Sequence, residues 1–384
     1  MKILHVIDEF KVGGAQTHLE TMLVAAGRRY PTFRHRVIGL TEAGPIGERI
    51  AQRGVAVTAL ELGAAIRKRR LDIVTQALGR LIREERPDVV EAHLTWSRLC
   101  GLPPARVLGV PVRIGYEQGD TYFTSLAFRS ANFLLQHAAQ RVVVCSEALG
   151  DWAHRTHRIA RARLWVLHNC VDVSRFVPRS PGASGPAWGF GANSTVFAAV
   201  GSLGNGVNKR VDVCLRGIAA ARQRGADVAL VVAGDGPQRA ALEHLAAELG
   251  IAASVRFLGI RSDVPEVLAK CDAFCHAAPF EPFGIVCVEA LATGLPAIVP
   301  DEGGMREAVD RESGVIYRTL DHEALGSAMA SLTNPELRHK MGPAARRRAE
   351  THFSADAYVD TLYAGYAELL AGFGRVNGTP RAAR

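Results

Sequence analysis

The sequence predicts an α/β protein built from two doubly wound domains, in which helices cover both faces of a parallel sheet. Short apolar runs alternate along the chain with longer stretches of helical periodicity, and this alternation is typical of parallel sheets. One stretch, PRSPGASGPAWGFG at residues 178–191, is rich in turn formers, lacks periodicity and divides the alternation into two halves. With 384 residues in the chain, each half is long enough to form its own core.

The expected strands are the apolar runs. Before the interruption they are KILHVI, HRVIGL, PDVVEAH, VRIGYE and RVVVCS, and after it STVFAAVGS, VALVVAGDG, VRFLG, CDAFCHAA and LPAIVP. Helical stretches between them include residues 16–27, 71–85, 211–224 and 237–249. Ligands bind beyond the carboxyl ends of the strands in such sheets, so the residues that follow each run are the candidate site residues.

The C-terminal part predicts one more helix and a tail. Side chains at helical spacing predict a helix over 354–372 that packs by one face, namely Tyr358, Leu362, Tyr363, Tyr366 and Leu370. We expect this helix to cross back to the first domain. The predicted division is a first domain at 1–178, a linker at 179–191, a second domain at 192–353, this helix, and a disordered tail at 373–384.

The composition is that of a globular protein, with 48% hydrophobic and 22% charged residues. No apolar stretch reaches the roughly 18 residues of a spanning helix, so none is expected. The start MKILHVIDEF predicts a strand rather than a signal peptide. Seven scattered cysteines favour reduced thiols in the cytoplasm. Cys271 and Cys275 lack a matching second pair, so no metal site is expected there.

Positive charge is concentrated in the first half. Residues 1–180 carry 26 Lys and Arg against 16 Asp and Glu, whereas the remainder carries 20 against 22. This asymmetry favours an acidic partner such as phospholipid head groups, a lipid diphosphate or nucleic acid. The run Arg67, Lys68, Arg69 and Arg70 is either a solvated loop or a contact with an anionic membrane surface. No aromatic interleaving accompanies the cations, so nucleic acid is not expected as a partner.

Three glycine-containing loops follow predicted strands. Gly13 and Gly14 follow the first strand, where they form either a tight turn or a close backbone approach to a ligand. The loop GSLGNGVNKR at 201–210 ends in Lys209 and Arg210, which suits a diphosphate, although a solvated loop is the alternative. Gly234 opens the turn GDGP after another strand. The chain contains neither GxGxxG nor GxxxxGK, the usual markers of dinucleotide enzymes and P-loop proteins.

The stretch FEPFGIVCVEALATG at 280–294 places Glu289 in an apolar helix. A buried carboxylate without a partner costs several kcal/mol or changes its pKa, so a polar group must meet it. Backbone N–H groups are expected to be free at the start of this helix, at Phe283, Gly284, Ile285 and Val286, and would suit an anion. Glu289 lies about 9 Å further along, roughly the reach from a diphosphate to a ribose. Its partner is therefore either ribose hydroxyls or an internal arginine or backbone group.

These motifs together resemble the family-four retaining glycosyltransferases, which have the two-domain GT-B fold with Rossmann-like domains facing across a cleft. The resemblance rests on the Glu281-x7-Glu289 signature and on landmarks in family order, namely MKILHVIDEFKVGGAQTHL, VLHNCVDVSRF, VNKRVD, VVAGDGP, VRFLG and FEPFGIVCVEALATGLPAIVPDEGG. It extends from Met1 to about Leu370.

The resemblance implies transfer of a sugar from a UDP- or GDP-sugar to a cell-envelope polysaccharide, lipopolysaccharide or glycolipid acceptor, with retention of the anomeric configuration. Glu289 would hold the ribose, and Glu281 the transferred sugar. Lys209 and Arg210, with the Gly13–Gly14 loop and the helix amides, would hold the diphosphate. Arg261 would face the nucleobase and His93 the sugar or acceptor, unless His93 is a strand-end histidine bonded to a neighbour. The role of Gly303, Gly304 and Glu307, which match a further family stretch, stays open.

The chain departs from the family pattern in three places. Ser202 replaces a frequent arginine, Gln118 a frequent histidine, and Cys170 a usual glycine. Gln118 can donate a hydrogen bond towards the acceptor but cannot titrate, which speaks against a general base there. The chain contains no Asp-x-Asp, the metal–diphosphate clamp of the other glycosyltransferase fold, so we expect no metal and no cofactor.

Two alternatives remain at this point. Nucleotide-sugar epimerases share the architecture but lack the Glu-x7-Glu arrangement, and a degenerate nucleotide-binding relative would account for Ser202 and Gln118. The expected location is cytoplasmic, with possible peripheral binding to the inner face of the cell membrane.

Overall fold

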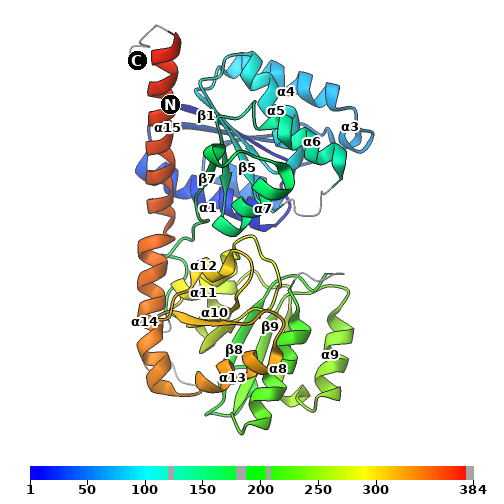
Figure 1. Cartoon of the computed structure of the whole chain (residues 1–384), viewed down its shortest axis with the longest axis vertical. Helices are drawn as coiled ribbons and strands as arrows, with labels where there is room; N and C mark the ends of the chain where they lie inside the picture. Colours follow the sequence, from blue (N-terminus) through cyan, green and yellow to red (C-terminus); the bar gives the residue numbers. More distant parts are fainter. Residues whose placement is uncertain (120–124, 179–186, 205–208, 378–384) are drawn as a thin grey trace. The chain divides into compact units, whose positions relative to one another are not determined.

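The computed structural model describes residues 1–119, 125–178, 187–204 and 209–377 (Figure 1). The chain divides into two compact units. Unit 1 consists of Met1–Cys170 with Ala355–Arg384, and unit 2 of Val171–Ser354. In each unit the described strands form one parallel sheet, as the alternation of apolar runs and helical stretches predicts.

The sheet of unit 1 has seven strands in the order β3-β2-β1-β4-β5-β6-β7. Their bounds are β1 Lys2–Ile7, β2 Arg34–Gly39, β3 Ala56–Ala59, β4 Val89–His93, β5 Val112–Glu117, β6 Arg141–Val144 and β7 Leu164–Val166. The order reverses between β1 and β4, the point at which doubly wound sheets bind ligands beyond their carboxyl ends.

The helices of unit 1 cover both faces of its sheet. They are α1 Gly14–Arg29, α2 Pro45–Gln52, α3 Gly63–Arg67, α4 Leu71–Glu85, α5 Thr95–Val107, α6 Leu126–Leu135, α7 Glu147–His157 and α15 Ala355–Asn377. One core joins α1 and α15 to the sheet through residues such as Leu19, Ile114 and Tyr366. A second core joins α4 and α5 to the sheet, and Leu78 and Cys100 lie in it.

The sheet of unit 2 has six strands in the order β10-β9-β8-β11-β12-β13. Their bounds are β8 Thr195–Val200, β9 Val228–Ala233, β10 Val255–Gly259, β11 Ala273–Cys275, β12 Ala297–Pro300 and β13 Gly314–Tyr317. The helices are α8 Val211–Gln223, α9 Arg239–Glu248, α10 Val264–Ala269, α11 Ile285–Ala292, α12 Met305–Ala308, α13 His322–Ser331 and α14 Pro335–His352. The order reverses between β8 and β11, so the loops after these two strands lie at the switch point.

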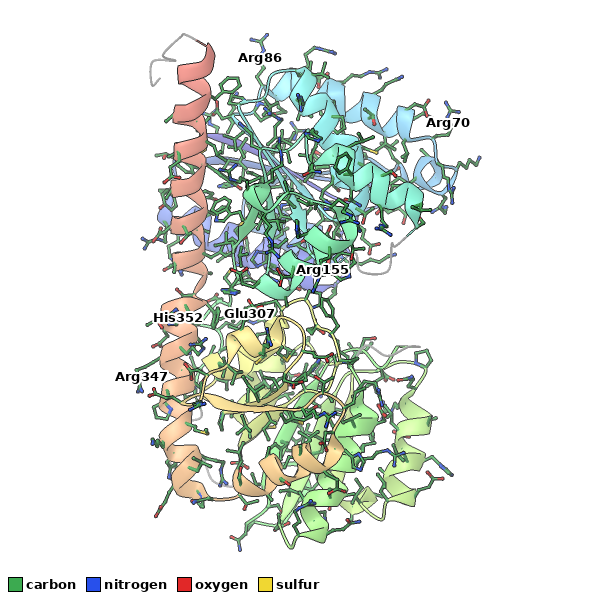
Figure 2. All side chains as sticks on the ribbon, in the orientation of Figure 1. Arg70, Arg86, Arg155, Glu307, Arg347 and His352 are labelled. Carbon is green, nitrogen blue, oxygen red and sulfur yellow. The ribbon has the colours of Figure 1, made fainter. Side chains whose placement is uncertain are left out.

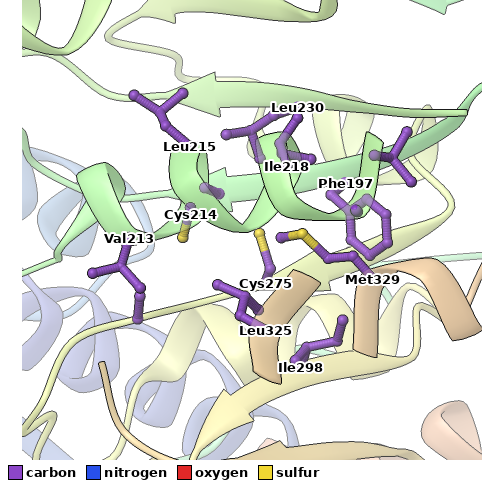
Figure 3. Packing of buried hydrophobic residues seen from close by; sticks show 14 of the residues in the cluster. Phe197, Val213, Cys214, Leu215, Ile218, Leu230, Cys275, Ile298, Leu325 and Met329 are labelled. Atoms are coloured by element: carbon purple, nitrogen blue, oxygen red, sulfur yellow. The ribbon is translucent and has the colours of Figure 1, made fainter. Parts of the chain in front are cut away.

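The core of unit 2 is built where α8 and α13 pack against the sheet (Figure 3). The two helices approach closely because each presents a glycine to a side chain of the other. A Cβ on Gly217 would lie 2.8 Å from Leu325 Cγ, and one on Gly326 would lie 2.7 Å from Ala220 Cβ. Cys214 and Cys275 are buried in the same cluster among Phe197, Ile218 and Met329. This packing fixes the strands that carry the loops described below.

The boundary between the units differs from the one expected at residue 178, because residues 171–178 belong to unit 2. Val171 N–H donates to Phe353 O at 2.8 Å, and Phe176 is buried. Residues 179–186 of the expected linker lie outside the described residues. Helix α15 belongs to unit 1 and continues to Asn377, beyond the expected end at 372. Residues 378–384 of the expected tail also lie outside the described residues.

Candidate functional site

Unit 2 brings two predicted site residues into direct contact. Lys209, at the end of the loop that follows β8, donates from Nζ to Glu281 Oε2 at 2.6 Å. Glu281 lies in the loop between β11 and α11. The side chains are 25% and 19% exposed, so the pair is accessible to a solute while being shielded from bulk water. The two chain segments meet because their strands are neighbours at the switch point of the sheet.

The backbone of Glu281 is held by the turn that follows β12. Gly304 N–H donates to Glu281 O at 2.8 Å. Gly303 has φ +75°, and a Cβ there would lie 2.9 Å from both the nitrogen and the oxygen of Glu281. Glycine is therefore required at 303, both by the left-handed conformation and by the close approach. This gives the Gly303–Gly304 pair a role that the sequence left open, which is to position Glu281.

Helix α11 begins directly after Gly284, which has φ +80°. A Cβ at Gly284 would lie 2.1 Å from Met305 Cε, so α11 starts in a position that only glycine fits. The first N–H groups of a helix, here those of Ile285 and Val286, have no acceptor within the helix and suit an anion. Phe283 is buried and packs edge-to-face on Phe353, which fixes this end of the loop.

Glu289 lies in the second turn of α11 and is half-buried. Burial raises its pKa to about 7, and the charge of Arg175 offsets only part of this. Within the described residues its carboxylate has no hydrogen-bond or ion-pair partner, whereas its backbone oxygen accepts from Thr293 N–H and Thr293 Oγ1. A carboxylate in this state is costly for folding unless hydrogen-bond donors reach it.

The other cations predicted for the donor lie close to acidic neighbours. Arg210 donates to both carboxylate oxygens of Asp212 at 2.8 Å, and Arg261 pairs likewise with Asp263. Gly234 N–H donates to Gly259 O, which ties the turn after β9 to the end of β10. Among these residues, Lys209 is therefore the cation that contacts Glu281.

His276 is a site residue that sequence reasoning missed. It directly follows β11, is 3% exposed, and its Nε2 lies 3.8 Å from Glu281 Oε2. Burial lowers the pKa of His276 to about 4, with Glu281 acting to raise it and Lys209 to lower it. The available signal was its place at the end of the strand CDAFCHAA, immediately before the loop that carries Glu281.

Three of the residues predicted in unit 1 lie at the ends of neighbouring strands, with Gly13 after β1, His93 at the end of β4 and Gln118 after β5. Gly13 caps α1 in extended conformation and Gly14 is exposed at the start of that helix. Gln118 follows β5, and both atoms of its amide are buried without a hydrogen-bond partner in the part of the chain that the structure describes. An unpartnered buried amide is compatible with a polar ligand there.

His93 is fully buried at the end of β4. Its Nε2 lies 3.4 Å from Glu91 Oε2, and its ring stacks on Tyr116 at 4.3 Å between centroids. The interpretation as a strand-end histidine near a neighbour therefore fits the geometry better than direct contact with sugar or acceptor. The assignment to sugar or acceptor stays a prediction.

The surroundings of His93 form a buried polar cluster, which we define as His5, His35, Glu91, His93 and Tyr363. The parallel register of β1 and β4 places His5 opposite Glu91. His5 Nδ1 lies 3.2 Å from Glu91 Oε2, and His5 Nε2 lies 3.0 Å from His35 Nδ1. His35 in turn lies 3.5 Å from the hydroxyl of Tyr363 on α15. Burial raises the pKa of Glu91, but His5 and His93 outweigh it and hold that pKa well below its usual range.

Three members of this cluster carry ligand types that a divalent metal accepts. The ligand atoms of His5, Glu91 and His93 lie within 4.8 Å of one another. The rings of His5 and His93 stack at 26° to each other, and Glu91 and His93 are fully buried inside unit 1.

The basic run at the start of α4 is exposed. Arg69 has φ +56°, and Arg70 pairs with Asp72 at 2.8 Å. Figure 2 shows Arg70 at one end of α4 and Arg86 at the other. Within the described residues, no helix is both long and apolar enough to cross a membrane.

The fold and site define a transferase with two Rossmann-like domains of the GT-B type, and the comparisons name its family. The family model "Glycosyltransferase Family 4" matches residues 12–175, and "Glycosyl transferases group 1" matches residues 186–348. Together they leave only the termini and a short stretch between them unmatched. The chain belongs to the family-four glycosyltransferases.

The curated relatives are also glycosyltransferases. A D-inositol 3-phosphate glycosyltransferase of Saccharomonospora viridis is 33% identical over 248 residues, which are 61% of this chain and 57% of that protein. A GDP-mannose-dependent alpha-(1-6)-phosphatidylinositol dimannoside mannosyltransferase of Mycobacterium tuberculosis is 35% identical over 144 residues, 38% of this chain and 37% of that protein. The chain thus matches less than two thirds of the length of these relatives.

Among solved structures, the Anabaena protein Alr3699/HepE in complex with UDP and glucose has a TM-score of 0.77 at 19% identity. The similarity covers 96% of this chain and all of that one. At this identity the likeness establishes the fold, which agrees with the predicted class.

Proposed function

We propose that the chain is a retaining glycosyltransferase that takes a sugar from a UDP- or GDP-sugar. The observation that carries the proposal is Glu289. Its carboxylate is half-buried, has a pKa raised to about 7, and lacks a partner among the described residues. The vicinal hydroxyls of a ribose would supply two donors to such an acceptor. The inositol phosphate and phosphatidylinositol relatives and the UDP complex of the Anabaena protein support a nucleotide-sugar donor.

Lys209 and Glu281 fit the other half of such a donor. Lys209 is half-buried, and its ammonium group forms an ion pair with Glu281. Helix α11 begins four residues after Glu281 and offers the free backbone N–H groups of its first turn. In the proposed reaction Lys209 and these amides stabilise the negative charge that develops on the leaving diphosphate. Fixed donors of this kind lower a barrier by up to several kcal/mol. Glu281 then binds hydroxyls of the transferred sugar.

Retention follows in this proposal from attack on the same face of the sugar as the leaving group. The leaving phosphate oxygen takes the proton of the acceptor hydroxyl, so no separate base is required. Gln118 is consistent with this because an amide cannot take a proton. We propose that the reaction uses neither a metal ion nor another cofactor.

The proposed acceptor is a saccharide or lipid-linked saccharide of the cell envelope, reached at an anionic membrane surface. The exposed run Arg67, Lys68, Arg69 and Arg70 supports this, as do relatives named for phosphorylated inositol and phosphatidylinositol acceptors. Cations near anionic lipid contribute about 1 kcal/mol each.

The proposal is tested by calorimetry with UDP and GDP on the wild type and two variants. Glu289→Gln should weaken binding of the preferred nucleoside diphosphate by about 1–3 kcal/mol, because a charge-assisted hydrogen bond is lost. Glu281→Gln should not weaken that affinity, because it frees Lys209 from its ion pair, and it should reduce turnover of the full sugar donor. Equal affinity of wild type and Glu289→Gln for both nucleotides would contradict the ribose assignment.

Product analysis with a mixture of nucleotide sugars separates the competing functions. Transfer to an acceptor supports the proposal. An epimerised donor would indicate an isomerase, and binding without any product would indicate a degenerate relative.

A further inference from the structure

The ion pair of Lys209 with Glu281 conflicts with the separate roles that the proposed function gives the two residues, and the inference rests on that function. Lys209 and Glu281 bind each other at 2.6 Å, yet in the reaction the first serves the diphosphate and the second the sugar. The donor must therefore break this ion pair. When Lys209 turns to the phosphates, Glu281 Oε2 loses the only hydrogen-bond donor that the described residues give it. A half-buried carboxylate left in this way is costly unless a second donor takes over.

His276 is placed to be that donor. Its Nε2 is buried, has no hydrogen-bond partner among the described residues, and lies 3.8 Å from the oxygen that Lys209 holds. This separation exceeds the 2.7–3.2 Å of an N–H···O hydrogen bond, so the contact is not made in the ligand-free state. His276 Nε2, which has no partner among the described residues, thus lies 3.8 Å from Glu281 Oε2, the oxygen that must change its hydrogen-bond donor.

The ring of His276 is fixed in place by its strand. The backbone N–H of His276 donates to Ile298 O at 3.0 Å, and its carbonyl accepts from Tyr317 Oη at 3.1 Å. The ring itself stacks on Phe274 at an interplanar angle of 15°. The backbone contacts come from β12 and β13, and the ring contact comes from Phe274 on β11, the strand that His276 directly follows.

The backbone of Glu281 is equally constrained, by Gly304 and by the close approach of Gly303. The gap can therefore close only by rotation of the Glu281 side chain. Lys209 is guided in a similar way, because its stem lies against Gly201, where a Cβ would be 3.1 Å from Lys209 Cε. The ammonium group can swing while its stem stays in place.

We propose that His276 is a positioning residue that receives Glu281 Oε2 from Lys209 when the diphosphate of the donor draws Lys209 away. His276 donates from Nε2–H as a neutral imidazole, so the exchange moves no proton. Its effect is to keep Glu281 directed at the sugar during the step in which the glycosidic bond breaks.

The electrostatics agree with this exchange. In the ligand-free site, burial and Lys209 keep the pKa of His276 low, so the imidazole is neutral at neutral pH. Phosphate oxygens would neutralise the charge of Lys209, while burial, the larger influence on the pKa of His276, would still keep the imidazole neutral.

The test compares His276→Phe, which keeps a ring stacked on Phe274 but has no donor, with His276→Gln, whose amide can replace Nε2–H. The affinities of UDP, GDP, UDP-glucose and GDP-mannose are measured by calorimetry, and the slow hydrolysis of the sugar nucleotide that binds is followed without acceptor. We expect His276→Phe to bind the nucleoside diphosphate at least about fivefold more weakly than the wild type, because Glu281 is left without a donor when Lys209 turns to the phosphates. Its hydrolysis rate constant should fall at least tenfold, and His276→Gln should recover most of that loss.

The outcomes distinguish this inference from the proposed function. If the wild type binds none of the four nucleotides, the proposed function fails. If the wild type binds and hydrolyses a sugar nucleotide and His276→Phe does so at an unchanged rate, only the inference fails. Equal losses in His276→Phe and His276→Gln would also overturn it, because a structural role does not depend on the donor.

A second measurement needs no change at His276. In the wild type, the imidazole Nε2–H signal of His276 is followed by nuclear magnetic resonance before and after saturation with UDP or GDP, whichever binds. We expect a slowly exchanging proton to appear on saturation, since a hydrogen bond to Glu281 protects it. A signal that does not change would contradict the exchange even if His276→Phe does not fold.

Discussion

Unit 1 and unit 2 each place a histidine near a carboxylate beside the end of a parallel strand, with opposite results. In unit 1, Glu91 and His93 are fully buried, and tyrosines of α15 lie over them. In unit 2, Glu281 remains 19% exposed beside the buried His276, and the half-buried Lys209 reaches it. The difference lies in what covers the strand ends. In unit 1, helix α15 packs over the sheet and makes Glu91 and His93 part of a core. In unit 2, the glycine-containing loops beside Glu281 leave its carboxylate accessible to a ligand.

The largest expected effect is on the free energy of unfolding, and it concerns Glu91 in unit 1 rather than Glu281 in unit 2. Glu91→Gln should lower the free energy of unfolding by about 3 kcal/mol, because it removes a buried charge on which two histidines depend. Nucleoside diphosphate affinity should be unchanged. Denaturant unfolding and calorimetry measure the two quantities. The matched control is Glu85→Gln, which breaks a part-exposed pair with Arg36 and should cost less than about 1 kcal/mol.

If Glu91→Gln instead abolished nucleotide binding while leaving unfolding unchanged, the cluster of unit 1 would belong to the site and the contrast drawn here would fail. The measurement should treat the units separately, since two domains need not unfold in one transition.

A smaller effect of opposite sign is expected at Glu289. Its pKa, raised to about 7, lies above the usual value of 4.5, so the folded state holds a proton that the unfolded state releases. Stability should therefore fall as pH rises from about 4.5 to 7, and the loss is complete above 7. Glu289→Gln removes this dependence and should be more stable than the wild type at pH 8 by about 1–3 kcal/mol.

Thermal or denaturant unfolding at pH 5 and pH 8 checks the sign. Glu243→Gln, which breaks an exposed pair with Arg239 in the same unit, is the control and should show no such gain. If Glu289→Gln gains stability and loses nucleotide affinity, the Glu289 side chain serves nucleotide binding at a cost in stability. A loss of stability at both pH values would argue for an internal partner instead.

The exposed cations of unit 1 allow a test of membrane binding that is separate from nucleotide binding. Replacing Arg67, Lys68, Arg69 and Arg70 by Ser should cut binding to phosphatidylglycerol vesicles and leave nucleotide affinity intact, because exposed charges act over only about 8–10 Å. Replacing Arg80, Arg83 and Arg86, exposed elsewhere on unit 1, is the control for net charge. Wild-type protein that stays in the supernatant with such vesicles at low salt would contradict the membrane proposal.

No effect at all is expected from metal removal. Activity should survive EDTA, because Lys209 and the amides of α11 stabilise the leaving diphosphate in the proposed reaction. Complete loss of activity that Mg²⁺ or Mn²⁺ restores would overturn this. Loss that only Zn²⁺ restores would instead direct attention to His5, Glu91 and His93, whose ligand atoms lie near one another.

The sequence predicted well wherever the signal was local. Helical periodicity placed a helix at 71–85, and the structure has α4 at Leu71–Glu85. The run KILHVI coincides with β1. Lys209 was a candidate because it ends a glycine-rich loop that follows a strand, and Glu281 was one through the Glu281-x7-Glu289 signature of the family that the sequence resembles.

What the sequence did not predict depends on contacts between distant segments. Nothing near residue 171 signals its hydrogen bond to Phe353, so the unit boundary was placed too late along the chain. His93 gave no sign of being buried, because tyrosines of α15 far along the chain contribute to its surroundings. The ion pair of Lys209 with Glu281, and the position of His276 beside it, require the strand order β8-β11, which periodicity does not reveal.

The membership of α15 in unit 1 has a consequence for biosynthesis. Tyr358, Leu362 and Tyr366 are buried in a core whose members outside α15 come from the first 170 residues. Unit 1 therefore cannot complete its core until these last residues have left the ribosome, whereas every strand of unit 2 is available earlier. The usual order, in which the N-terminal domain folds first, is reversed. During synthesis, the apolar face of unit 1 that α15 covers therefore stays uncovered until α15 has been made.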